Sequence, residues 1–345
     1  MTVSSALDGG DTPPLAADRP LSILDYSWHQ AHSYRLHALP ATFYYAIYRY
    51  PVWNVAQRPM PPNFGGGIEP EALDEFHFDV ALAHLDQWCD GQNNLRALPY
   101  RLMTQWADER GLPVVVIMHG TPDNEANRRA ILRLIGDRPV VCNSLQAAEE
   151  WDYGEALADR YGLPQFRAIV HGYDVDEFWS EPLENRQTLA AITICSGGGM
   201  SREYHGIPLI ERLKRDVPLV WYGPRGDREW KPDYMAYREF LARMLIYFSP
   251  TRRAPMPGAR TEAMLSGCCI VTVPGHDVEG FIRHGETGFI VNTYEEARDT
   301  LEMLLRDPER AYEVGQDGRL EAMFRFDEEW YVKGWMDALR EIGGA

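Results

Sequence analysis

The sequence of 345 residues lacks the features that would assign it to a membrane or secreted class. No apolar run reaches the roughly 18 residues that a membrane-spanning helix needs. Residues 1–20 have neither a basic start nor an apolar middle, so they predict a flexible tail rather than a secretory signal. These absences predict a cytoplasmic protein without stable membrane insertion.

Cysteine and lysine are scarce. The five cysteines form no Cys-x-x-Cys pair, and four lie in apolar runs, which favours buried reduced thiols. Lysine occurs only at positions 214, 231 and 333, and the formal net charge is −17. Acidic residues also outnumber basic ones in residues 1–180, which argues against tight non-specific binding to nucleic acid. No Gly-x-Gly-x-x-Gly follows a first strand, which argues against a nicotinamide dehydrogenase.

Strand-like and helix-like segments alternate along the chain, as parallel sheets with crossover helices require, and the length suits two α/β domains. Residues 58–67, rich in proline and glycine, predict a loop without regular structure. The predicted strands are residues 21–26, 78–84, 112–118, 140–144, 166–170, 189–195, 218–222, 245–248 and 268–273. The predicted helices include residues 99–110, 294–306, 309–324 and 326–342, the last with Trp330, Tyr331, Trp335, Met336 and Leu339 on its apolar side.

The most informative stretch is residues 260–275, Arg-Thr-Glu-Ala-Met-Leu-Ser-Gly-Cys-Cys-Ile-Val-Thr-Val-Pro-Gly. Glu262 is predicted to open a helix that ends at Gly267 and leads directly into a strand. A carboxylate in the first turn of a helix lies in the field of unpaired amides. It can also accept two hydroxyls, as the vicinal diol of a ribose offers. Residues 278–291, Val-Glu-Gly-Phe-Ile-Arg-His-Gly-Glu-Thr-Gly-Phe-Ile-Val, then predict a helix, a glycine turn and another buried strand.

This block resembles the donor-nucleotide half of GT-B glycosyltransferases, the retaining group that uses nucleotide sugars. The pieces Glu-Ala-Met-x-x-Gly and His-Gly-Glu-Thr-Gly-Phe-Ile-Val carry the resemblance, which covers residues 112–325 well and the first hundred residues poorly. It implies two Rossmann-like domains that face each other across a cleft. It also implies transfer of a hexose from a UDP- or GDP-linked sugar, with retention, with no metal, and with no cofactor besides the nucleotide sugar as co-substrate.

The resemblance divides the chain into a tail at residues 1–20, an acceptor-side domain at 21–180, a linker at 181–187 and a donor-side domain at 188–325. Residues 326–345 then form a helix that returns to the first domain. In the donor domain, Glu262 is expected to bind the ribose. Where the family has Gly-Arg and then Lys-Gly, residues 195–206 here read Cys-Ser-Gly-Gly-Gly-Met-Ser-Arg-Glu-Tyr-His-Gly.

The glycines of that stretch would let backbone amides approach the diphosphate, although a flexible turn is an equal alternative. A second departure is sharper, because the family usually carries two glutamates eight positions apart, and eight before Glu262 stands Ala254. This leaves the donor sugar open. Two interpretations of the clustered arginines stay open: their guanidiniums bind the diphosphate, or they are simply exposed to solvent. The remaining donor-side candidates are Gly198, Gly199, Arg202, His205, Arg252, Arg253, Gly258 and Arg260.

The first half supplies two catalytic candidates, His119 and Asp25, both at strand ends, where ligands bind in open α/β sheets. In the resembling family a histidine at the place of His119 reaches the donor sugar; the alternative is a polar residue bonded to backbone. His29 and His32, in a histidine-rich segment after the first strand, are acceptor-side candidates. No third ligand stands at a fixed spacing from them, so a zinc site is not expected.

Asp86 and Gln87 are further acceptor-side candidates. The acceptor itself stays open between a saccharide, a lipid-linked sugar and a small molecule, with nucleic acid less favoured by the acidic first half. Other functions compatible with the same fold are a nucleotide-sugar epimerase, a phosphorylase, and a non-catalytic nucleotide-sugar binding protein.

Overall fold

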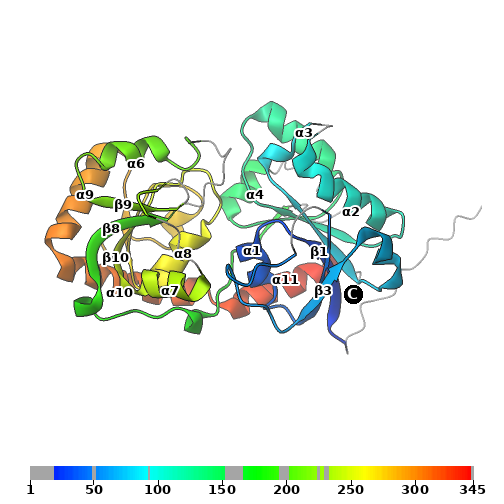
Figure 1. The fold of residues 1–345 in the computed structure, drawn as a ribbon. Helices are drawn as coiled ribbons and strands as arrows, with labels where there is room; N and C mark the ends of the chain where they lie inside the picture. Colours follow the sequence, from blue (N-terminus) through cyan, green and yellow to red (C-terminus); the bar gives the residue numbers. More distant parts are fainter. Residues whose placement is uncertain are drawn as a thin grey trace, which may run out of the picture.

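The computed structural model describes residues 19–48, 52–91, 94–151, 166–193, 202–223, 226–228 and 233–342. These residues form two parallel sheets flanked by helices, one in each half of the chain (Figure 1). The first sheet has the order β3-β2-β1-β4-β5-β6-β7, and the second has the order β12-β11-β10-β8-β9. In both, the order reverses beside the first strand, and this reversal is where ligands bind in folds of this class.

The first sheet consists of β1 (Leu21–Tyr26), β2 (Ala41–Ala46), β3 (Phe64–Ile68), β4 (Val80–Leu85), β5 (Val114–Met118), β6 (Val140–Cys142) and β7 (Phe166–Ala168). β5 is buried along its whole length, as a central parallel strand should be. The prediction of an irregular loop at residues 58–67 was wrong at its end, where β3 forms an edge strand. Glycine suits this strand because a Cβ at Gly65 would approach the Tyr44 ring to 2.7 Å.

The helices of the first half are α1 (Gln30–Leu36), α2 (Leu98–Asp108), α3 (Glu125–Ile135) and α4 (Leu145–Trp151). Short 3-10 helices join them: η1 (Pro70–Glu75), η2 (Gln87–Cys89), η3 (Leu95–Ala97), η4 (Val175–Glu177) and η5 (Leu183–Asn185). Ser144 caps α4, since its Oγ accepts the Ala147 N–H at 3.0 Å.

The second sheet consists of β8 (Gln187–Thr193), β9 (Leu219–Tyr222), β10 (Met244–Ser249), β11 (Cys269–Thr272) and β12 (Phe289–Ile290). Its helices are α6 (Ile207–Leu213), α7 (Tyr234–Arg243), α8 (Gly258–Leu265), η6 (Val278–Gly280), α9 (Tyr294–Arg306) and α10 (Pro308–Arg325). The predicted helix start at Glu262 was wrong. α8 begins at Gly258, directly after two prolines, so Glu262 lies in its second turn and not beside the unpaired amides.

The last helix, α11 (Glu328–Ile342), returns to the first sheet, as expected (Figure 1). Tyr331, Trp335 and Leu339 pack in one apolar cluster with residues of β1, β2, β4 and β5. Trp330, predicted on the same side, is instead 65% exposed, because it lies about 100° around the helix from Tyr331. The chain therefore crosses between the sheets twice, and Tyr173 N–H donates to the Phe326 carbonyl at 2.9 Å where the crossings meet.

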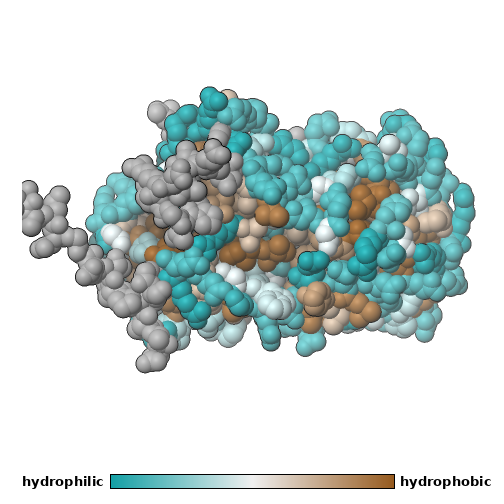
Figure 2. All heavy atoms as spheres, turned by 180° about the vertical axis from the view of Figure 1, so that it is seen from behind, coloured by the Kyte–Doolittle hydropathy of each residue, from teal (hydrophilic) through white to brown (hydrophobic). Residues whose placement is uncertain are grey.

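Hydrophilic residues cover most of the face seen in Figure 2, and hydrophobic side chains reach it only in patches. Among the described residues no helix is long and apolar enough to cross a membrane. Cys89, Cys142, Cys268 and Cys269 are buried free thiols, as predicted. Cys195 lies outside the described residues.

Candidate active site between the two sheets

A cavity of about 220 Å³ lies between the two halves of the chain. Its wall in the first half comes from segments that follow β1, β4, β5, β6 and β7, and its other wall comes from residues 204–205, residues 254–258 and α8. The carboxyl ends of both sheets therefore contribute to one site. Eight of the residues singled out in the sequence line it: His29, His32, Asp86, Gln87, His119, His205, Gly258 and Glu262.

The four arginines predicted to bind the diphosphate do not gather in this cavity. Arg202 is exposed and pairs with Glu211 at 2.6 Å, and Arg252 is exposed as well. Arg253 pairs with Asp123 of the first half at 3.0 Å. Arg260 is buried over the Phe281 ring, and burial lowers its pKa to about 10. Gly198 and Gly199, the other predicted diphosphate ligands, lie outside the described residues.

Three side chains at neighbouring strand ends form a hydrogen-bonded row. His84 Nε2 lies 2.7 Å from Asp25 Oδ1, and His84 Nδ1 lies 2.8 Å from His119 Nε2. Asp25 and His84 are fully buried, whereas His119 lines the cavity. Asp25 is thus connected to the cavity through His84 and does not line it.

The histidines around this row are held neutral. His32 Nδ1 lies 3.0 Å from His171 Nε2, and the edge of the His32 ring meets the His119 ring at a centroid distance of 4.8 Å. Burial, and then the neighbouring imidazoles, keeps the pKa values of His32 and His119 well below their ordinary value. Burial and Arg35 lower the pKa of His171 to about 3. At neutral pH these rings are therefore uncharged.

Glu262 lies at the opposite side of the cavity, and protein groups already surround its carboxylate. Oε1 accepts from Arg35 at 3.1 Å and from Arg58 at 2.8 Å, and Oε2 accepts from the Tyr237 hydroxyl at 2.8 Å. Both arginines come from the first half of the chain. Arg35 also pairs with Glu177 at 2.9 Å, so this buried network joins the two sheets.

A second contact joins the two halves at the other edge of the cleft. The Asp277 carboxylate accepts the N–H groups of Leu145, at 2.5 Å, and Gln146, at 3.0 Å, which open α4. His276 N–H donates in turn to the Gln146 side chain at 2.5 Å. Asp277 and His276 have positive φ angles of 63° and 54°, which are costly for residues other than glycine.

The wall opposite the histidines is apolar where the resembling family has a glutamate. Ala254, Pro255 and Met256 line it, and Met256 holds a positive φ of 48°. At the outer rim the Arg96 guanidinium lies over the rings of Trp28, at 4.9 Å, and Trp88, at 5.5 Å. Within the described residues no group of three or more His, Cys, Asp or Glu side chains is arranged to hold a metal ion.

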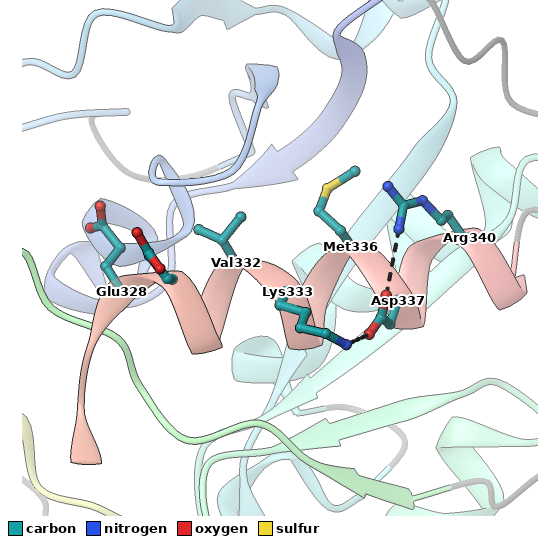
Figure 3. Close-up of a pocket in the computed structure, with 7 residues that line it drawn as sticks. Glu328, Val332, Lys333, Met336, Asp337 and Arg340 are labelled. Carbon is teal, nitrogen blue, oxygen red and sulfur yellow. Dashed lines mark hydrogen bonds and ion pairs between the residues drawn. The ribbon is translucent and has the colours of Figure 1, made fainter. Parts of the chain in front are cut away.

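A second hollow, of about 380 Å³, runs along one side of α11 (Figure 3). One helix alone lines it, and its charged side chains pair with each other, Lys333 with Asp337 at 2.6 Å and Arg340 with Asp337 at 3.5 Å. No strand end contributes to it. The cavity between the sheets is therefore the better candidate site.

Sequence reasoning missed His84, Arg35 and Arg58. His84 had a usable signal, since it stands at the end of a strand between those of Asp25 and His119. Arg58 had none, because it lies 204 positions from Glu262 in a segment that the resemblance does not reach.

A comparison with known protein families assigns most of the second half of the chain to a class of protein domain. Residues 230–321 match the family described as Glycosyl transferases group 1. The second half carries a group 1 glycosyl transferase domain. Glu262 and the whole of α8 fall within the group 1 match, which supports an enzyme of the transferase class. No curated protein sequence matches the chain.

Several solved structures share the fold of the whole chain, including that of the group 1 domain. HepE of Anabaena, in complex with UDP and glucose, has a TM-score of 0.68 at 14% identity over 93% of this chain and 100% of its own. Sucrose-phosphate synthase of Thermosynechococcus elongatus has a TM-score of 0.63 at 14% identity over 94% and 99%. A glycosyltransferase of Rickettsia africae has a TM-score of 0.59 at 12% identity over 94% and 98%. The chain therefore has the GT-B fold.

Proposed function

We propose that this protein transfers a hexosyl group from a UDP- or GDP-linked sugar to an acceptor held against the first domain, with retention and without a metal ion. The observation that carries the proposal is the position of Glu262, which lies inside the group 1 match and also lines the cavity between the sheets. HepE of Anabaena is similar in fold and was solved with UDP-glucose, which supports a nucleotide-sugar donor.

Donor binding at Glu262 requires a change in the hydrogen bonds that its carboxylate already accepts. A carboxylate offers about four lone-pair sites, and three donors already use them: Arg35, Arg58 and Tyr237. A ribose diol brings two further donors, so at least one existing bond must open. Arg58, on an exposed loop, is the more accessible of the two arginines, so its bond to Glu262 is the one that we expect to open.

The donor sugar must be recognised without the usual first glutamate. Ala254 lines the cavity at that position, so no carboxylate there can bind the sugar hydroxyls. Polar groups of the other wall remain for this task, among them His119 and Asn143. Asn143 Oδ1 is buried without a hydrogen-bond partner among the described residues, as a group awaiting a ligand hydroxyl would be.

The test is calorimetry with a panel of UDP- and GDP-linked hexoses, on Glu262→Gln and on Arg58→Ala as the matched control. A hydrogen bond to a charged group contributes about 1.5–3 kcal/mol, so Glu262→Gln should weaken donor binding roughly 10- to 100-fold. Arg58→Ala removes a competing donor and should leave binding unchanged or tighter. Equal affinity of wild type and Glu262→Gln for every donor would refute the ribose role.

A second measurement is needed to test whether the protein catalyses transfer. Release of free nucleoside diphosphate from a bound donor would support transfer over mere binding, and turnover of the donor into another nucleotide sugar would point to an epimerase. The anomeric configuration of the product, read by proton NMR, tests retention. Activity after exhaustive chelation tests the metal-independent mechanism.

A further inference from the structure

Gln87 is buried beside the cavity, yet its side-chain amide forms no hydrogen bond. The residue is 1% exposed and lines the cavity, and neither Oε1 nor Nε2 has a hydrogen-bond partner among the described residues. An unpaired amide in the interior costs stability, and such groups are rare in native proteins. A ligand that completes the hydrogen bonds of this amide would account for it.

The surroundings give the amide a defined position. Gln87 begins η2 directly after β4, and its carbonyl accepts from Asn127 Nδ2 at 2.6 Å. The preceding residue, Asp86, is held by Arg96, whose Nε donates to the carboxylate at 2.8 Å. The side chain also needs a glycine beside it, because a Cβ at Gly120 would lie 1.7 Å from Gln87 Oε1. The amide is therefore pre-organised for a ligand, in a place that Gly120 leaves open.

The first-half wall around Gln87 carries no uncompensated charge within the described part of the chain. Arg96 is the guanidinium that this half brings to the cavity, and the Asp86 carboxylate pairs with it. The histidines of the wall are uncharged, because burial lowers the pKa of each: His29, His32, His119 and His171. An anionic acceptor would therefore bring a charge for which this wall has no free partner, and an unpaired buried charge is costly.

The chemistry of the Gln87 amide suits hydroxyl groups. It offers two N–H donors and one acceptor oxygen, and two neighbouring hydroxyls of a sugar ring can bond to both ends. An ionised phosphate or carboxylate only accepts, so it would leave Oε1 unpaired. His32 Nε2, which is also buried without a partner among the described residues, offers a further polar position on the same wall.

The amide is also separate from the groups that remain for the donor sugar. Gln87 follows β4 and Asn143 follows β6, and β5 lies between these two strands in the sheet. The wall can therefore present hydroxyl-binding groups at two places, one for each substrate.

We propose that the acceptor is an uncharged polyhydroxylated molecule, a neutral sugar ring, and that Gln87 selects it through hydrogen bonds to two neighbouring hydroxyls. The proposal rests on the proposed function and narrows its acceptor to one chemical class. Phosphorylated sugars and nucleic acid fall outside this class, because their charge finds no partner at Gln87 and their phosphate oxygens cannot donate to Oε1.

Unfolding of the ligand-free protein tests whether the amide has a structural role instead. Burial raises the pKa of Tyr204 and the Gln87 amide opposes the rise, so these two side chains lie close together across the cleft. Gln87→Met keeps the length of the side chain and loses no hydrogen bond, so the midpoint of urea unfolding should stay the same or rise. Gln146→Met is the matched control, because its amide donates to Glu150 at 2.8 Å and accepts from His276 at 2.5 Å, and its midpoint should fall. A fall in Gln87→Met would show that the amide holds the two halves together and would overturn the proposal.

Release of nucleoside diphosphate from the donor panel identifies the acceptor class. The probes are water alone, neutral sugars (glucose, galactose, mannose, N-acetylglucosamine and their disaccharides), phosphate esters of the same sugars, and p-nitrophenol. Neutral sugars should raise the rate above that in water, and the phosphate esters should not. Gln87→Met should raise KM for the best neutral sugar roughly 10- to 100-fold, with a much smaller change in kcat, because two hydroxyls lose their partners. Gln105→Met, at an exposed position of α2, should leave that KM unchanged.

The possible outcomes separate this inference from the proposed function. If the wild type releases no nucleotide from any donor, with water or with any acceptor, the proposed function fails and the inference with it. If the wild type turns over but no neutral sugar raises the rate, or a phosphate ester or the phenol is the better acceptor, the neutral acceptor alone is refuted. An equal KM for neutral sugars in Gln87→Met and the wild type refutes the role of Gln87. Circular dichroism of each variant excludes misfolding as the cause of a raised KM.

Discussion

Two of the contacts that join the domains differ in the groups that form them. At Glu262 the contact is a buried ion network that includes Arg35, Arg58 and Glu177. At Asp277 it is a half-buried carboxylate bound to the backbone amides of α4. Breaking a buried ion pair leaves a charge in a poorly solvated place, whereas water can replace a partner at a half-exposed helix end. The difference indicates that the cleft opens more readily at the Asp277 edge.

The largest expected effect comes from removing Arg35. Arg35→Ala leaves both Glu262 and Glu177 without their shared partner, and removing one member of a buried ion pair typically costs about 3–5 kcal/mol. We expect a loss of that size in the free energy of unfolding, measured in urea. Arg283→Ala, which breaks the pairs of an exposed guanidinium with Glu286 and Glu321, is the control and should cost about 0–1 kcal/mol. A small loss of unfolding free energy in Arg35→Ala would contradict the conclusion that the contact at Asp277 opens more readily than the contact at Glu262.

An effect of intermediate size concerns His171, whose pKa is lowered to about 3 by burial and by Arg35. The unfolded chain binds a proton here below about pH 6.5 and the folded chain does not, so stability falls as pH drops from 6.5 towards 3. The loss is about 1.4 kcal/mol per pH unit for one imidazole.

His171→Gln should remove that contribution from the slope of unfolding free energy against pH between 6 and 4.5. His77→Gln, at an exposed histidine, should leave the slope unchanged. An unchanged slope for His171→Gln would show that the ring is protonated in the folded protein.

The smallest effect is expected at the other contact. Asp277→Ala removes the carboxylate that accepts the first two N–H groups of α4 while the Ser144 cap remains, and a capping interaction of this kind contributes about 0.5–2 kcal/mol. The loss should appear as faster hydrogen exchange at Leu145 and Gln146, with the amides near Glu262 unaffected. Uniformly faster exchange in both places would mean that the two contacts open together.

Sequence patterns predicted those elements and site residues that neighbouring residues in the chain determine. The bounds of β1 and α9 were predicted to the residue, because β1 is a short, mostly apolar run and Thr293 caps the start of α9. Glu262 was placed at the cavity by its motif, but the start of its helix was missed, because Pro257, four residues before Thr261, marks the boundary and the acidic residue does not. The pairing of Arg35 with Glu262 joins residues 227 positions apart, and no local pattern encodes such a contact. The four arginines expected at the diphosphate do not line the cavity, and their role stays a prediction.

The paired crossing at Tyr173 and Phe326 has a consequence for motion. A single connecting strand would let one domain swivel freely about it, but two strands bonded side by side resist torsion and leave mainly bending in one plane. Gly172 tightens this joint, since a Cβ there would lie 2.3 Å from the Cβ of Tyr331 and force α11 away. The joint therefore favours one alignment of the histidine wall with α8.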